Sequence, residues 1–418
     1  MIRLFVSLAL LFLISCTPPL VENEYFVENL MKREPKKFQY FLDHADTLQI
    51  QIIYTQINRD SINRPNFKSF YFRADSNQYF YPASTVKLPM LLLALEKLNN
   101  LRQQGFKVDK FTPIFHDSAY EGQFSVKMDT TAQDRMPSVA HYGKKILVVS
   151  DNDAYNRLYE FVGQRQTNEQ FRAKGYLLKL FHRLERPLNP DQNRHTEPVR
   201  FVTNDSVVYQ QKMLVNPDSI KPRRKVFKGK GFIKSDTLIE RPFDFTYKND
   251  YPLHEQQEIL KAILFPQSVP PQRRFSLSDD DRKFVLQYMS QLPTETEWPN
   301  YKKDTAMYDA YCKFLMFGDN RQPIPKNIRI FNKVGDAYGY LIDNAYIVDL
   351  DKGIEFMLSV VINTNTDGIY NDGEYEYKAL GFPFMRDIGQ AVYQYEVGRR
   401  RKFKPNLSEF RFQYDLPR

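Results

Sequence analysis

Ser84 and Lys87 stand at a spacing that could support nucleophilic chemistry. They are three residues apart at the start of a strongly apolar stretch, and residues three apart share one face of a helix. A serine hydroxyl is a weak nucleophile until a base removes its proton, and a helix N-terminus favours negative charge. Lys87 could be that base if burial and a second ammonium group lower its pKa.

Two further boxes could complete such a site: Ser150-Asp151-Asn152 and Lys333-Val334-Gly335. The first offers a hydroxyl and an amide, and the second offers the additional ammonium group. Gly335 would let the backbone approach a ligand closely.

Each box also has a purely structural interpretation. Ser84 could cap a helix with Lys87 on its surface, and Ser150 or Asp151 could be the N-cap of the helix that follows. Lys333 could be an exposed lysine at the end of a strand. Capping and catalysis are compatible in the second box, so both interpretations stay open there.

In this order the boxes resemble the S-x-x-K, S-D-N and K-T-G motifs of penicillin-recognising serine enzymes. The run Tyr81-Pro82-Ala83-Ser84-Thr85-Val86-Lys87-Leu88-Pro89 is similar to the text around the nucleophile of class A β-lactamases. The resemblance covers roughly residues 30 to 200 and 325 to 398. It implies a serine hydrolase that needs no cofactor.

The resemblance also implies a role for each box residue. Ser84 would attack an amide carbonyl, Lys87 would take its proton, and Ser150 would deliver a proton to the leaving nitrogen. Asn152 and Lys333 would orient the substrate. The backbone N–H groups of Ser84 and Asp336 would form the oxyanion hole, with Gly335 beside the ligand. Val334 departs from the family, which has a hydroxyl there, so weaker binding of a β-lactam carboxylate is expected.

A general base for deacylation is less clear. Glu185-Arg186-Pro187-Leu188-Asn189 fits the E-x-x-L-N-like loop of class A enzymes, which makes Glu185 the candidate. A second alignment places Arg183 to Arg186 on a segment just before the family's glutamate and His195 to Val199 at the loop's exit. Glu185 would then be a structural ion-pair partner, turned toward an arginine such as Arg183.

The rest of the composition excludes other chemistries. The six histidines have no metal-ligand spacing, and no phosphate-binding glycine loop occurs. Cys312 lies in an apolar pattern typical of a buried small hydrophobe. We therefore expect no metal. The formal net charge is +9, but a nucleic-acid partner is not expected for an exported lipoprotein.

The elements that position these residues come from both ends of the chain. Apolar patterns predict a helix over 22–43, strands over 49–54 and 68–72, a buried helix after Ala83 and a mostly helical stretch over 100–200. Strands follow over 328–333, 340–350 and 355–363, and a helix over 383–397. These patterns predict an α/β fold, and the order of its elements resembles the β-lactamase/transpeptidase type. An antiparallel sheet from the N- and C-terminal segments is flanked by helices, and a helical lobe is inserted over about 84–325.

The ends and the middle of the chain carry further predictions. Residues 1–15 resemble a lipoprotein signal peptide that ends at Cys16, which would be acylated; an ordinary cleaved signal is the alternative. Residues 16–30 would be a linker, 31–398 the catalytic domain and 399–418 a basic tail. The segment 205–305 fits the family least, and its basic run over 221–230 is either a solvated loop or a contact for anionic envelope material.

The sequence thus predicts a monomeric, exported, lipid-anchored serine hydrolase, on the outer membrane facing the periplasm. Its predicted substrate is a β-lactam or a peptidoglycan-like amide. The alternatives are a cell-wall D,D-peptidase or transpeptidase of the same fold, and a non-catalytic envelope lipoprotein that uses the fold for binding.

Overall fold

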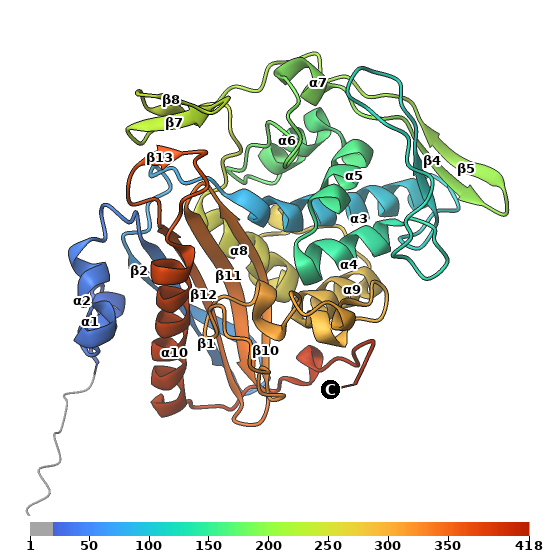
Figure 1. The fold of residues 1–418 in the computed structure, drawn as a ribbon. Helices are drawn as coiled ribbons and strands as arrows, with labels where there is room; N and C mark the ends of the chain where they lie inside the picture. The colour runs from blue at the N-terminus through green and yellow to red at the C-terminus, as the bar shows by residue number, and fades with distance from the viewer. Residues whose placement is uncertain (1–19, 418) are drawn as a thin grey trace, which may run out of the picture.

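The structure is a computed structural model that describes residues 20–417. At its centre lies a five-stranded antiparallel sheet in the order β10-β11-β12-β1-β2 (Figure 1). Its strands are β1 (Gln51–Arg59), β2 (Pro65–Phe72), β10 (Ile328–Ala337), β11 (Tyr340–Asp349) and β12 (Ile354–Asn363). The predicted sheet from both chain ends is therefore confirmed. The signal peptide and Cys16 lie outside the described residues.

Both faces of this sheet are buried. Alternating residues of β12 point to different cores: Met357 packs into the core of the helical lobe, whereas Leu358 packs toward helix α10. Helix α10 (Phe382–Gly398) lies across one face, and α8 (Leu253–Leu264) packs against β11 and β12 on the other (Figure 1).

Two short helices join α10 at the sheet. They are α1 (Phe26–Lys32) and α2 (Pro35–Asp43), where one helix over 22–43 was predicted. Pro35 explains the division, because proline fits the first turn of a helix and not its interior. Phe26 is fully buried, so this part of the predicted 16–30 linker is packed protein.

The helical lobe surrounds α3 (Lys87–Gln103), which is apolar on all sides and buried as its sequence predicts. Around it lie α4 (Val139–Val149), α5 (Asn152–Val162), α6 (Gln164–Ala173), α7 (Pro190–Arg194) and α9 (Asp279–Ser290). The prediction of a mostly helical stretch over 100–200 is partly wrong. Residues 104–138 carry one short strand, β3 (Ile114–His116), which pairs with β4 (Val199–Thr203) and through it with β5 (Ser206–Gln211).

The segment 205–305 contains two different parts. Helices α8 and α9 supply buried residues such as Leu260 and Val285 to the main core, so they are no appendage. The short strands are β6 (Phe227–Lys228), β7 (Gly231–Lys234), β8 (Thr237–Ile239) and β9 (Phe243–Asp244). Strand β7 pairs with β13 (Ile369–Tyr370) at one edge of the molecule (Figure 1). Strand β6 pairs with β9.

Both basic segments have partners within the protein. Arg223 and Arg224 form ion pairs with Asp250 at 3.4 and 3.2 Å, which supports the loop interpretation of the basic run. In the predicted tail, Arg401 pairs with buried Glu396, and Phe410 is buried in the lobe's core. The described part of the tail is therefore packed against the domain. None of the helices in residues 20–417 is long and apolar enough to cross a membrane.

Candidate active site

Ser84 lies in a tight turn at the start of α3. The turn is a 3₁₀ helix, Ala83–Val86, held by hydrogen bonds from the Thr85 backbone N–H and hydroxyl to the Pro82 carbonyl, at 3.1 and 2.7 Å. Ala83 has φ +48°, a backbone conformation that a non-glycine residue seldom adopts. This geometry places half-buried Ser84 at the N-terminal end of α3, where it lines the cleft.

Lys87 is fully buried beneath the cleft. Its ammonium donates to the Ser150 backbone carbonyl and lies 3.3 Å from the Ser150 hydroxyl oxygen. Burial, and then the neighbouring charge of Lys333, hold the pKa of Lys87 well below its usual value. The lowered pKa favours the neutral amine, which is the form that a general base requires.

Lys333 reaches the same hydroxyl from strand β10. Its ammonium donates to Ser150 Oγ at 2.7 Å and to the Val334 carbonyl at 2.9 Å. Burial lowers the pKa of Lys333 to about 8. The two lysines and Ser150, predicted from separate boxes, thus form one connected group.

The second box turns the chain sharply between two helices. Ser150 ends α4 with φ +61°, and the Asp151 side chain caps α5 by accepting from the Ala154 N–H at 2.7 Å. Asn152 is the first residue of α5 and lines the cleft. Asp151 is therefore the N-cap, while the Ser150 hydroxyl faces the lysines.

Gly335 allows strand β10 to pack directly on the Ser84 turn. A Cβ atom at this position would lie 2.8 Å from the Pro82 carbonyl oxygen and 3.0 Å from the Ser84 nitrogen. The next residue, Asp336, lines the cleft together with Ser84. This places the two residues of the expected oxyanion hole on adjoining segments. Val334 is buried in the core and lines the smaller of the two arms into which the cleft divides at Ser84.

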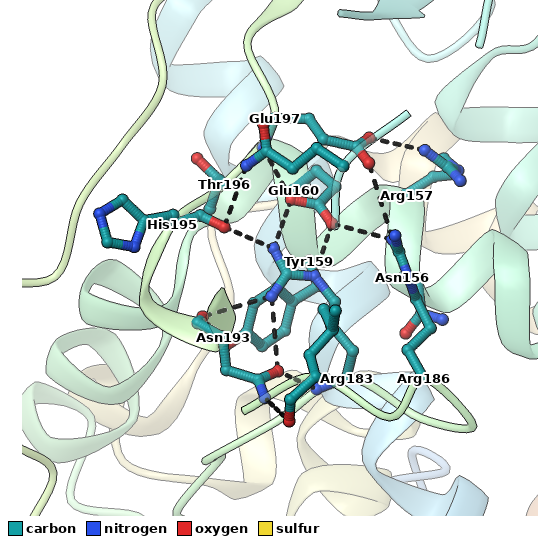
Figure 2. A network of polar contacts seen from close by, with 12 residues as sticks. Asn156, Arg157, Tyr159, Glu160, Arg183, Arg186, Asn193, His195, Thr196 and Glu197 are labelled. Atoms are coloured by element: carbon teal, nitrogen blue, oxygen red, sulfur yellow. Dashed lines mark hydrogen bonds and ion pairs between the residues drawn. The ribbon is translucent and has the colours of Figure 1, made fainter. Parts of the chain in front are cut away.

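Glu185 also lies at the cleft. It is exposed, has φ +51° and lines both arms of the cleft near Ser84. Arg183 pairs instead with Glu160 of α5, through two contacts at 2.6 and 2.7 Å (Figure 2). The alternative that turned Glu185 away from the cleft toward Arg183 is therefore wrong.

The loop that carries Glu185 is fastened by a buried network that the sequence analysis did not find. Arg183 donates to the His195 carbonyl at 2.8 Å, and Glu197 accepts from Arg157 at 2.6 Å (Figure 2). The Glu197 N–H donates to Glu160 at 2.8 Å. No residue pattern signals these partners, because they come from α5 and from both ends of the loop.

Other candidate groups are placed as follows. Cys312 is buried and lines the smaller arm of the cleft, and burial raises the pKa of its thiol to about 11, which disfavours the reactive thiolate. Within residues 20–417, no three His, Cys, Asp or Glu side chains are grouped so that they could hold a metal ion.

The cleft has two arms that meet at Ser84. The larger has a volume of about 750 Å³ and runs past Asn152, the Glu185 loop and Tyr338. The smaller has a volume of about 280 Å³ and runs past Ser150, Val334 and Tyr311. An amide bound with its carbonyl at Ser84 could thus extend in two directions.

Comparisons with known proteins give a family match over part of the chain and structures of similar fold. No curated protein sequence matches the chain. Among solved structures, a β-lactamase from Sphaerobacter thermophilus is 14% identical, with a TM-score of 0.44 over 87% of this chain and 97% of that one. PBP-A in an acyl-enzyme complex with penicillin G is 15% identical (TM-score 0.45; 88% and 96% covered). A class A β-lactamase from Clostridium kluyveri is 12% identical (TM-score 0.45; 87% and 99% covered).

The family match covers one segment of the sequence. Residues 36–220 match the model of the β-lactamase enzyme family, and this segment contains the first two boxes and Glu185. The third box lies outside it, and the fold brings Lys333 to Ser150. The resemblance drawn from the motifs is thus confirmed as a match to the β-lactamase enzyme family over residues 36–220.

Proposed function

We propose that this protein is a serine hydrolase that forms an acyl-enzyme on Ser84 and hydrolyses a β-lactam amide. The observation that carries the proposal is the group of Lys87, Lys333 and Ser150 beside Ser84. One lysine of low pKa can take a proton from the nucleophile, and the Ser150 hydroxyl can pass a proton on.

The proposed reaction has two steps. The neutral Lys87 amine takes the Ser84 proton as Oγ attacks the amide carbonyl, and the backbone N–H groups of Ser84 and Asp336 stabilise the oxyanion. Ser150 gives its proton to the leaving nitrogen and is reprotonated from the lysines. Glu185 then takes a proton from a water that attacks the acyl-enzyme ester, and the bond between the acyl carbon and Ser84 Oγ breaks as Oγ regains that proton.

The location of the protein is part of the proposal. By the resemblance of its first residues to a lipoprotein signal, we infer export and a lipid anchor at Cys16 on the outer membrane, facing the periplasm. A hydrolase held there would meet β-lactams and peptidoglycan-like amides before they reach the inner membrane.

Intact-protein mass spectrometry after mixing with benzylpenicillin tests the function. We expect a transient adduct that maps to Ser84, with release of hydrolysed penicillin, and no adduct on the Ser84→Ala variant. A stable adduct on Ser84 would indicate a penicillin-binding D,D-peptidase or transpeptidase instead. An adduct on another residue, or none with no turnover, would refute the proposal and leave a binding role.

A further inference from the structure

A lysine from the segment that resembles the family least lines the larger arm of the cleft. In the proposed reaction Ser150 protonates the leaving nitrogen, so the leaving group occupies the smaller arm, which Ser150 lines. The acyl portion of the substrate then extends into the larger arm. Lys248 lines this arm and not the smaller one.

Lys248 is held in a fixed position beside the Glu185 loop. The buried side chain of its neighbour Asn249 accepts from the backbone N–H of Phe181 at 2.8 Å and of His182 at 3.3 Å. The Lys248 N–H donates to the Phe245 carbonyl at 2.9 Å. The backbone around Lys248 is thus tied to the segment that leads into the Glu185 loop.

The ammonium of Lys248 has aromatic neighbours and no acidic partner. It lies 5.8 Å from the ring centroids of both Phe243 and Tyr338, and the side chain is half-buried. Across the described chain, no carboxylate lies within ion-pair distance of it, whereas the nearby Arg223 and Arg224 both pair with Asp250. A half-buried cation at a cleft wall without a counter-ion is suited to bind an anion.

Tyr338 contributes an aromatic side chain to the lining of the larger arm. Its φ is +55°, and its ring packs edge-on against Tyr81 and Phe245, with centroids 5.0 and 5.4 Å apart. The side chain remains half-exposed and lines the arm. A strained residue held by several rings presents one fixed aromatic surface next to the Lys248 ammonium.

Two acidic residues, Glu185 and Asp336, line the larger arm together with Lys248. Asp336 interacts electrostatically with Lys87, Lys333 and Glu185, whereas Lys248 interacts electrostatically with His182.

We propose that Lys248 is a specificity-determining residue that binds a carboxylate on the acyl portion of the substrate, beside an aromatic or apolar group that packs on Tyr338. This inference rests on the proposed function, because that function assigns the acyl portion to the larger arm. It gives the segment around β6 to β9 a role in substrate selection.

Three penicillins that differ only at the acyl α-carbon test this subsite. Carbenicillin carries a carboxylate there, benzylpenicillin a hydrogen and ampicillin an ammonium group. We expect the second-order acylation rate to be roughly tenfold higher for carbenicillin than for ampicillin, as one charge-assisted contact would give. Lys248→Met should abolish this ratio, and Lys248→Glu should invert it. Lys225→Met, which removes an exposed lysine outside the cleft, should keep the ratio.

Calorimetric binding of phenylmalonate and phenylacetate separates the subsite from the reaction. Phenylmalonate should bind several-fold tighter to the wild type, and Lys248→Met should remove the difference. If phenylmalonate binds in this way and no penicillin acylates Ser84, the proposed function fails and the subsite stands. If neither the acylation ratio nor phenylmalonate binding depends on Lys248, the subsite is refuted, whether or not Ser84 is acylated.

Discussion

The hydroxyl of Ser150 lies between the ammonium groups of Lys87 and Lys333 and contacts both. It accepts from Lys333 and lies near the Lys87 ammonium, and both lysines have lowered pKa values because they are buried. Like charges this close cannot both keep their protons easily. The arrangement favours one neutral amine and one ammonium, which the proposed mechanism needs at the same time.

Replacement of Lys87 tests its role as the base. Lys87→Met should lower the acylation rate roughly 10²–10⁴-fold, since it removes proton transfer from Ser84. Lys87→Arg should be nearly as poor, because arginine stays protonated. Stopped-flow acylation with a chromogenic β-lactam measures both. Near-normal acylation by the arginine variant would exclude Lys87 as the base.

The pH profile should report Lys333. Its ammonium is present below its pKa of about 8 and is lost as the pH rises through that value. If the substrate needs this charge, acylation should fall above pH about 8. Lys333→Arg keeps the charge at higher pH, so its alkaline limb should move upward. An unchanged limb in this variant would assign the limb to another group.

Glu185 decides how the acyl-enzyme is released. Glu185→Gln should leave acylation nearly intact and slow deacylation by roughly 10²–10⁴-fold, the usual contribution of a general base. The measurement is the lifetime of the Ser84 adduct by mass spectrometry. An unchanged lifetime would mean that the exposed Glu185 carboxylate does not activate the water.

At the scale of elements, the Glu185 loop depends on helix α5. Glu160 of α5 accepts two contacts from Arg183 and one from the Glu197 N–H, so a single carboxylate fastens both ends of the loop. Arg183 and Glu160 are essentially excluded from solvent. Removing one of the two charges would leave the other buried without a partner, which lowers the free energy of unfolding.

Glu160→Gln should therefore lower the free energy of unfolding by roughly 3 kcal/mol. It should also loosen the loop that positions Glu185, so that deacylation slows more than acylation. Thermal unfolding and adduct lifetime measure the two effects. The matched control is Glu169→Gln on α6, whose partner Arg165 is exposed and whose loss should change stability little. Equal effects of the two variants would contradict an anchoring role for Glu160.

How well the elements could be predicted depended on their pattern. Strands β10 to β12 and helices α3 and α10 carry long apolar runs and were located within a few residues. Residues 104–138 follow no period and were wrongly expected to be mostly helical, because their course is set by contacts with Val139 to Phe201 and not by local preference. The serine and lysine boxes were found by spacing. Lys248 and Glu160 could not be found in this way, since only the fold brings Lys248 to the cleft and Glu160 to the Glu185 loop.

At the scale of the whole molecule, the predicted anchor can be tested by location. Cys16→Ser should abolish lipidation, so the protein should be recovered unprocessed or in the soluble fraction. Fractionation and N-terminal mass analysis measure this. Tight membrane association of the variant, with the first fifteen residues removed, would contradict anchoring through Cys16.

The packing of Gly335 against the Ser84 turn joins segments that are some 250 residues apart in the chain. Such distant contacts form late in folding, because the intervening chain must first be ordered. Under the proposed function, an incompletely folded chain contains Ser84, but its oxyanion hole is not assembled and Lys333 is not in place beside Ser150. Only fully folded molecules would then be labelled covalently by a penicillin. The fraction of labelled protein at successive times of refolding would therefore measure the rate at which strand β10 packs against Ser84.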